Sequence, residues 1–190
     1  MKVDVAVVGG GILGLAAAAK VLETNPRARV AVLERDERVG GGQSSRNSGV
    51  LHAGIYYPQE SLKARWSTAG KREMERFCEA SGVPLVRTQK LVVAIDASEL
   101  PALNRLAMNA RVKKVPVEEL HASACRELGR NENAVAGFLS PTTANTDFGA
   151  VWDALRTKIE EAGVAVYTNT EVRSISQIES GTARVVSATG

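Results

Sequence analysis

The sequence has few of the residues that mark several common classes of protein. It contains two cysteines and two histidines in 190 residues, with no Cys-x-x-Cys spacing, so neither a disulfide framework nor a metal site is expected. Cys78 and Cys125 are predicted to be free thiols in a reducing compartment. No apolar segment is long enough for a signal peptide or a membrane span. These absences predict a cytoplasmic protein, with peripheral contact at the inner membrane left open.

An excess of charge is also missing. The 24 Lys and Arg residues nearly balance the 21 Asp and Glu residues, which leaves a net charge of +3. No run of basic residues concentrates this charge on one segment, so nucleic acid is not an expected partner. The hydrophobic content of 44% is enough to build the core of a globular chain.

What the sequence does contain, at its N-terminus, is a strand–helix–strand pattern. Apolar residues predict a strand over residues 3–8, an alanine-rich helix that ends near Asn25, and a second strand over residues 30–34. Both strands are continuous apolar runs, which is typical of parallel strands covered on both faces. The pattern therefore predicts a right-handed βαβ unit.

The turn between the first strand and the helix carries a dinucleotide-binding fingerprint. Gly9, Gly11 and Gly14 form G-x-G-x-x-G, and Glu34 follows at the end of the second strand. Gly9 permits the tight turn, and Gly11 lets a pyrophosphate approach the backbone. Gly14 lets the helix pack close to the strand.

The residues around this turn have matching roles. The backbone N–H groups of Ile12 and Leu13 begin the helix and are available to phosphate oxygens. Glu34 is placed to accept hydrogen bonds from ribose hydroxyls, and its charge disfavours a 2′-phosphate. The unit by itself leaves FAD, NAD and NADP open, with Arg35 as the residue that favours NADP.

The segment GGQSSRNSGVLHAGIYYP, residues 41–58, follows the acidic residue directly, where ligands bind in open α/β sheets. Its polar side chains supply hydrogen-bonding groups for phosphate and ribitol oxygens. They are Gln43, Ser44, Ser45, Asn47 and Ser48. Gly49 and Gly54 allow the backbone to approach a flat ring. Such a run favours FAD over NAD, because an extended flavin must be lined along its whole length.

Downstream, an amphipathic helix is predicted over residues 61–82. Its apolar stripe comprises Leu62, Trp66, Ala69, Met74 and Phe77. Strands and helices then alternate over residues 83–145. A further helix, strand material and a hairpin arm over residues 182–190 complete the chain.

This order predicts an α/β fold in which a Rossmann-like FAD-binding domain carries an inserted α+β portion of a substrate domain. Residues 1–82 are expected to form the first part of the FAD-binding domain and residues 83–145 the substrate-domain portion. Residues 146–190 are expected to form a second, incomplete part of the FAD-binding domain, truncated at the C-terminus.

Four motifs carry a resemblance to a known family. VVGGGILGLAAA, NSGVLHAGIYYP, SLKARW and SPTTANTDFGAV resemble the D-amino-acid-oxidase-like superfamily of flavoproteins, and most of all the L-2-hydroxyglutarate oxidase or dehydrogenase family. The resemblance implies FAD held by the fingerprint and the serine run, with the backbone of Val172 at the adenine. It also implies oxidation of L-2-hydroxyglutarate to 2-oxoglutarate by hydride transfer to the flavin.

Members of this family are longer than this chain, so an N-terminal fragment is expected, and its activity alone stays open. The partners expected are a small-molecule substrate and an electron acceptor, which is oxygen, a quinone or an electron-transfer protein.

His52 is the candidate catalytic base. Removing a hydride from a secondary alcohol leaves the hydroxyl proton for a base, and histidine suits this role at neutral pH. His52 lies in the glycine-flanked segment on the ligand side, and the resemblance puts it near the flavin ring. His121 is expected to be a surface residue.

Tyr56 is a candidate for shaping the substrate pocket. A dicarboxylate also needs cationic partners, and Lys63, Arg65 and Lys90 are available. Among these we assign Lys90 to the substrate site.

Several alternatives stay open at this point. One is a related flavoenzyme that acts on glycerol 3-phosphate or an amino acid. Another is an FAD-binding fragment without turnover. A third, an NAD-dependent dehydrogenase, explains the serine run poorly.

Overall fold

The structure is a computed structural model that describes residues 1–58, 60–179 and 181–188. The chain folds into two compact units, which we call unit 1 and unit 2. Unit 1 contains Met1–Ser48 and Phe148–Gly190, and unit 2 contains Gly49–Asp147. Unit 2 is therefore an insertion within unit 1, which is the arrangement that the sequence predicts.

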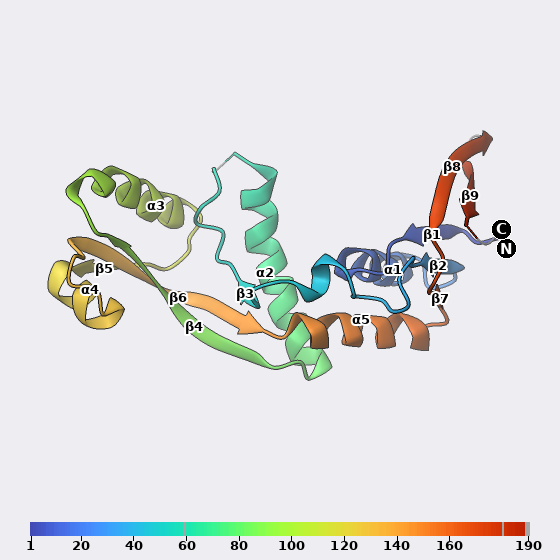
Figure 1. Ribbon diagram of the computed structural model, residues 1–190, viewed down its shortest axis with the longest axis horizontal. Helices are drawn as coiled ribbons and strands as arrows, with labels where there is room; N and C mark the ends of the chain where they lie inside the picture. Colours follow the sequence, from blue (N-terminus) through green and yellow to red (C-terminus); the bar gives the residue numbers. More distant parts are fainter. Residues whose placement is uncertain (59, 180, 189–190) are drawn as a thin grey trace. The chain divides into compact units, whose positions relative to one another are not determined.

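Unit 1 contains a parallel sheet, two helices and a hairpin (Figure 1). Its elements are β1 (Val5–Val8), α1 (Ile12–Thr24), β2 (Val30–Leu33), the 3-10 turn η1 (Gln43–Ser45), α5 (Phe148–Glu161), β7 (Ala165–Tyr167), β8 (Val172–Glu179) and β9 (Thr182–Ser187). The sheet has the order β1-β2-β7, with all neighbours parallel. The strands β8 and β9 pair as an antiparallel hairpin, as predicted, although residues 189 and 190 of the predicted arm lie outside the described residues.

The core of unit 1 lies between the central strand and the two helices. All four residues of β2 are buried, and α1 packs against α5. The helices contribute Leu15, Ala18, Val151, Leu155 and Ile159. The predicted coverage on both faces holds for β2 but is wrong for the edge strand β1, whose Ala6 and Val8 share one face and are exposed.

Unit 2 is built on an antiparallel sheet with β6 at its centre. Its elements are β3 (Val50–Leu51), α2 (Leu62–Ser81), β4 (Leu85–Ala94), the 3-10 turn η2 (Ala97–Glu99), α3 (Leu100–Val112), β5 (Glu118–His121), α4 (Ala122–Gly129) and β6 (Ala136–Thr146). Strand β4 pairs with β6 along nearly its whole length, with a bulge between Thr88 and Lys90. Strands β5 and β3 pair with the two halves of β6 in turn.

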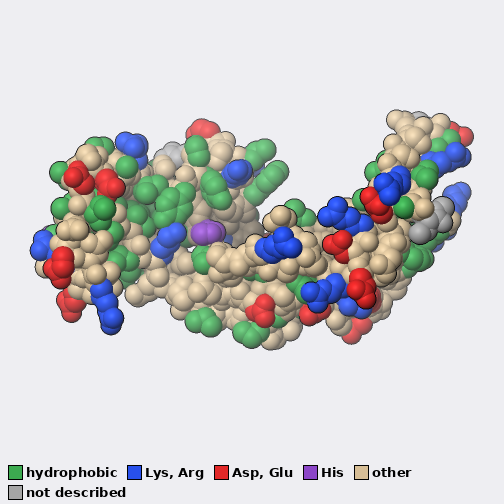
Figure 2. Space-filling model, viewed as in Figure 1, with side chains coloured by type: hydrophobic (Ala, Val, Ile, Leu, Met, Phe, Trp, Pro, Cys, Tyr) green, Lys and Arg blue, Asp and Glu red, His purple; other side chains and the backbone are tan. Residues whose placement is uncertain are grey.

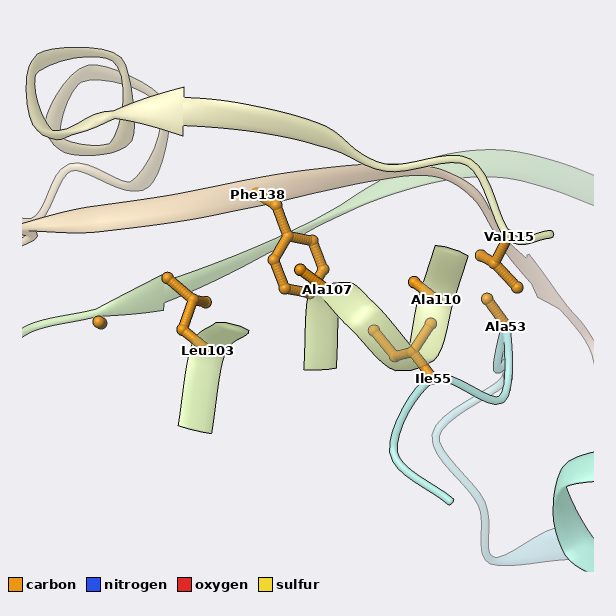
Figure 3. Close-up of a cluster of buried hydrophobic side chains, with 8 residues drawn as sticks. Ala53, Ile55, Leu103, Ala107, Ala110, Val115 and Phe138 are labelled. Atoms are coloured by element: carbon orange, nitrogen blue, oxygen red, sulfur yellow. The ribbon is translucent and has the colours of Figure 1, made fainter. Parts of the chain in front are cut away.

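The main core of unit 2 forms where α3 covers this sheet. Phe138 of β6 packs over α3, and Ala53 and Ile55 reach the same cluster from the segment that follows β3 (Figure 3). Ile55 is 1% exposed. The segment around His52 is therefore anchored on both sides, by β3 and by this buried pair.

The position of α2 along the chain is as predicted, but its buried face is not. Ser61 caps the helix by accepting a hydrogen bond from the N–H of Ala64, and Gly82 ends it in the left-handed conformation. The residues that α2 buries most deeply are Ala64 and Cys78, whereas Trp66 of the predicted stripe is 66% exposed. Hydrophobic side chains accordingly gather on the surface over the first turns of α2 (Figure 2). The small residues are buried because they allow the helix to approach the sheet closely.

The first predicted domain boundary also differs from the boundary of the compact units. Residues 49–82 were assigned to the FAD-binding domain, yet they pack in unit 2 because β3 pairs with β6. Compact units reflect packing, so the assignment of these residues to a functional domain stays a prediction. The second predicted boundary, near residue 146, also stays a prediction, and the compact units divide after Asp147.

Candidate functional site

The glycine turn joins β1 to α1 as the fingerprint predicts. Gly9 has φ +102°, a conformation that favours glycine, and its N–H donates to the carbonyl of Leu33. A Cβ on Gly14 would lie 1.9 Å from the carbonyl oxygen of Gly9, so α1 rests directly on the turn. The fingerprint glycines therefore bring the first turn of the helix to the carboxyl end of β1.

Glu34 is a buried carboxylate held by two backbone donors. Its Oε2 accepts from the N–H of Gly10 at 2.6 Å, and its Oε1 accepts from the N–H of Asp36 at 2.9 Å. These bonds hold the side chain in one orientation at the end of β2. Each carboxylate oxygen has more than one lone pair, so a ribose hydroxyl still has an acceptor here.

Ser44 closes the turn from the other side. Its hydroxyl oxygen accepts a hydrogen bond from the N–H of Ile12 at 2.9 Å, across 32 positions of the chain. The other polar residues of the serine run stabilise the run itself, because Ser45 donates to the carbonyl of Gly42 and Asn47 donates to that of Ser44. The run therefore forms a compact loop beside the N-terminus of α1.

A cavity of about 310 Å³ lies at this edge of the sheet. The predicted cofactor residues that line it are Gly9, Gly11, Glu34, Arg35, Gln43, Ser44 and Val172. The predicted residues that do not line it are Ile12, Leu13, Gly14, Ser45, Asn47, Ser48 and Gly49. All of the lining residues belong to unit 1.

The cavity also has a wall that sequence reasoning missed. The lining residues without a prediction are Val8, Leu33, Asp36, Gly40, Gly42, Thr170 and Glu171. Thr170 reaches the cavity because its N–H donates to the carbonyl of Glu34 at 2.7 Å. The signal was available in the topology: β7 continues the parallel sheet, and the carboxyl ends of its strands meet at one edge.

The charges around the cavity are mainly negative. Glu34, Asp36 and Glu171 line it, and Arg35 pairs with Asp36 at 3.5 Å. Carboxylates accept hydrogen bonds from ribose hydroxyls and repel a 2′-phosphate. The arrangement suits a dinucleotide without a 2′-phosphate.

Two glycines of the 41–58 segment have structural reasons within unit 2. A Cβ on Gly49 would lie 3.0 Å from the carbonyl oxygen of Thr146, where β3 joins β6. A Cβ on Gly54 would lie 2.4 Å from the hydroxyl oxygen of Ser67 on α2. Close packing therefore explains both positions, and their predicted approach to a flavin ring stays a prediction.

The segment 52–57 is where the structure gathers the predicted substrate and catalytic residues of unit 2. His52 is exposed, and its imidazole has no hydrogen-bond partner among the described residues. Tyr56 is 45% exposed, and the ammonium of Lys90 lies 4.4 Å from its ring centroid. The structure therefore brings Tyr56 and Lys90 together, although they lie far apart in the sequence.

Lys113, at the end of α3, holds this segment in place through hydrogen bonds to its backbone. Its ammonium donates to the carbonyl of Gly54 at 2.8 Å and to that of Tyr57 at 2.5 Å. Burial lowers the pKa of Lys113, and no carboxylate pairs with it in the described part of the chain. Sequence reasoning missed Lys113 because nothing local distinguishes it from its neighbour Lys114.

Lys113→Met is expected to lower the free energy of unfolding by about 1–3 kcal/mol, because two carbonyls lose their charged donor. Lys113→Arg is expected to restore much of the loss. The matched control is Lys114→Met, at an exposed lysine, with an expected change within about 0.5 kcal/mol. Urea unfolding measures each value. Equal stability of the two methionine variants would show that Lys113 fastens nothing.

The two cysteines are free, as predicted, and both are buried. The thiol of Cys78 lies 3.7 Å from the hydroxyl of Thr146, and burial raises the pKa of Cys125. Neither therefore has the exposed, electropositive surroundings of a reactive thiol. Among the described residues, no helix is both long enough and apolar enough to cross a membrane.

Together, the turn, the acidic residue and the cavity define a nucleotide-binding protein of the α/β class. The sequence matches the family described as FAD dependent oxidoreductase (DAO) over residues 4–190. The chain therefore belongs to this family. The predicted cofactor class, FAD, and the predicted enzyme class, a flavin-dependent oxidoreductase, are confirmed at this level.

Curated relatives are L-2-hydroxyglutarate dehydrogenases. The mitochondrial enzyme of Caenorhabditis elegans is 35% identical over 92% of this chain and 41% of its own length. The enzyme of Escherichia coli K12 is 30% identical over 94% of this chain and 42% of its own length. The human mitochondrial enzyme is 32% identical over 96% of this chain and 40% of its own length. The chain thus spans about two fifths of these relatives.

Solved structures confirm the predicted fold class. L-alpha-glycerophosphate oxidase from Mycoplasma pneumoniae, solved with FAD bound, matches with a TM-score of 0.92 and 26% identity, over 100% of this chain and 51% of that one. Glycine oxidase from Geobacillus kaustophilus matches with a TM-score of 0.85 and 26% identity, over 99% of this chain and 52% of that one.

Proposed function

We propose that this chain binds FAD along the cavity of unit 1. Gly11 has no side chain to block the N-terminus of α1, and that N-terminus offers N–H groups and the positive end of a helix dipole to the pyrophosphate. The N–H of Ile12 already donates to Ser44, so we assign the phosphate contact to the N–H of Gly11, which lines the cavity. Glu34 accepts hydrogen bonds from the ribose hydroxyls. The backbone at Val172 lies beside the adenine of FAD.

We further propose that the protein oxidises L-2-hydroxyglutarate to 2-oxoglutarate. The observation that carries this proposal is the similarity, at 30–35% identity over 92–96% of this chain, to L-2-hydroxyglutarate dehydrogenases of a nematode, a bacterium and a mammal. The bound flavin supplies the hydride acceptor for the hydroxyl carbon. An external acceptor, which is oxygen, a quinone or an electron-transfer protein, then takes the electrons.

In this mechanism, His52 takes the proton of the substrate hydroxyl. Its imidazole is exposed and has no partner among the described residues, so its ring nitrogens are available to a ligand. Lys113 holds the segment that follows His52 through two carbonyls, which limits the motion of the base. In this proposal FAD is bound by residues 1–82 and 146–190, and the substrate is bound by residues 83–145. The location in the cytoplasm stays a prediction, and peripheral contact at the inner membrane stays open.

The direct test is an absorbance spectrum of the purified chain after incubation with FAD and desalting. Flavin absorbance near ~450 nm that persists and then bleaches on anaerobic addition of L-2-hydroxyglutarate is the expected result. Retained flavin that no substrate bleaches would leave a binding module without turnover. Failure to retain flavin would contradict the proposal for this chain.

Glycerol 3-phosphate is the second candidate substrate. The observation in its favour is the TM-score of 0.92 with the L-alpha-glycerophosphate oxidase. Anaerobic addition of glycerol 3-phosphate to the same flavin-loaded sample separates the two. Bleaching by glycerol 3-phosphate, without bleaching by L-2-hydroxyglutarate, would identify glycerol 3-phosphate as the substrate.

A further inference from the structure

One face of the unit 2 sheet changes from apolar to polar along its length. Val92 and Phe138 are partners in the register of β4 and β6, and both pack in the core under α3. Side chains alternate between the faces of a sheet, so the next pair on this face is Lys90 with Ser140. Beyond the bulge, Thr143 is paired with Thr88 and follows on the same face.

Two hydroxyls of this polar stretch lack hydrogen-bond partners. Ser140 is 0% exposed and Thr143 is 5% exposed, and neither side-chain oxygen is bonded in the described part of the structure. A buried polar group without a partner is costly, and a ligand, a water or an ion that binds there removes this cost. Both hydroxyls can donate a hydrogen bond to an acceptor on a ligand.

Lys90 adds a positive charge beside these donors. Its ammonium lies over the ring of Tyr56, and no carboxylate pairs with it among the residues that the structure describes. Tyr56 also lines a second cavity, of about 400 Å³, together with Arg105 of α3. The ammonium-bearing Lys90 is half-buried, and the two hydroxyls beside it are buried, so the surroundings are cationic and rich in donors.

We infer that Lys90, Ser140 and Thr143 form an anion subsite, with Tyr56 as its apolar wall, that binds the second carboxylate of the substrate. The subsite rests on the proposed function and adds the residues that select a dicarboxylate. A carboxylate fits because it brings acceptors only, which match one ammonium and two hydroxyl donors. The apolar wall contacts the carbon chain between the two carboxylates.

The test uses the whole 190-residue chain and glutarate, a five-carbon dicarboxylate that cannot be oxidised at a hydroxyl. Isothermal titration calorimetry measures the dissociation constant. Lys90→Gln is expected to weaken glutarate binding about tenfold or more, because a charge-assisted contact is lost. A double variant, Ser140→Ala with Thr143→Val, is expected to weaken it several-fold while keeping the charge.

The matched control is Lys63→Gln. Lys63 also lies over a tyrosine ring in unit 2, 5.9 Å from the centroid of Tyr57, but it is exposed on α2. Glutarate affinity is expected to stay within about twofold of the parent chain, because the lost charge is solvated. Thermal unfolding of all variants confirms that each is folded.

Three outcomes would overturn the subsite: no binding of glutarate to the parent chain, equal weakening by Lys63→Gln and Lys90→Gln, or tighter binding of inorganic phosphate than of glutarate. The proposed function is tested separately by flavin bleaching. Bleaching without any dependence of glutarate affinity on Lys90 would leave the function standing and remove the subsite. Glutarate binding that depends on Lys90, without bleaching of the flavin, would leave the subsite standing and remove the proposed function.

Discussion

His52→Asn is expected to lower the rate of flavin reduction by L-2-hydroxyglutarate by about 100- to 10,000-fold, which is the range typical of a lost general base. Asparagine keeps a polar side chain of similar size but cannot take a proton at neutral pH. The neighbours Leu51, Ala53 and Ile55 are buried and hold the segment in place without help from the imidazole. The fold of unit 2 is therefore expected to survive the change.

The control is His121→Asn, at the second of the two histidines in the chain. His121 is exposed at the end of β5, and no side-chain hydrogen bond caps α4 there. Anaerobic stopped-flow at ~450 nm gives the reduction rate, and the same spectrum before mixing gives the flavin content. A reduction rate in His52→Asn equal to that of His121→Asn would remove His52 from the reaction.

Gly14→Ala is expected to cost unit 1 several kcal/mol of stability, at the upper end of the range for single substitutions. The added Cβ would lie 1.9 Å from the carbonyl oxygen of Gly9 and 3.1 Å from its carbonyl carbon. These are backbone atoms, so no side chain can rotate to make room. The N-terminus of α1 must move away from β1, and the cavity beside it is expected to lose its affinity for FAD.

Gly70→Ala provides a matched control for this clash. Both glycines lie inside helices, where alanine is favoured over glycine by about 1 kcal/mol. A Cβ on Gly70 meets no atom within 4 Å, so this change is expected to raise the stability slightly. Urea unfolding and flavin retention of both variants give the comparison. Similar behaviour of the two alanine variants would contradict the close packing of α1 on the turn.

The elements that the sequence predicts well are those that depend on neighbours in the chain. The βαβ unit follows from two apolar runs around a glycine turn. Helix α2 runs from Leu62 to Ser81 because Ser61 and Gly82 cap its two ends, and both are local signals. The fingerprint indicated a dinucleotide for the same reason, since its glycines act within one turn, and the serine run that follows favoured FAD.

The face that α2 buries could not be read in this way. An apolar stripe through Leu62 and Trp66 predicts one face, whereas the structure buries Ala64 and Cys78 on another. A helix period defines which residues share a face, but the partner surface selects the face that is covered. Here the sheet of unit 2 accepts the small residues.

The sequence by itself determined the class of fold, the family and the residues of the glycine turn, because each depends on short motifs of neighbouring residues and on their order along the chain. Only the tertiary structure decided that Ser44 accepts a hydrogen bond from the N–H of Ile12, that Thr170 reaches the end of β2, and that Lys113 holds the segment after His52. It also brought Lys90 to Tyr56 and left the hydroxyl of Ser140 without a hydrogen-bond partner among the described residues. The physical reason is that these contacts join residues far apart in the chain, and their geometry is set by strand register and helix packing.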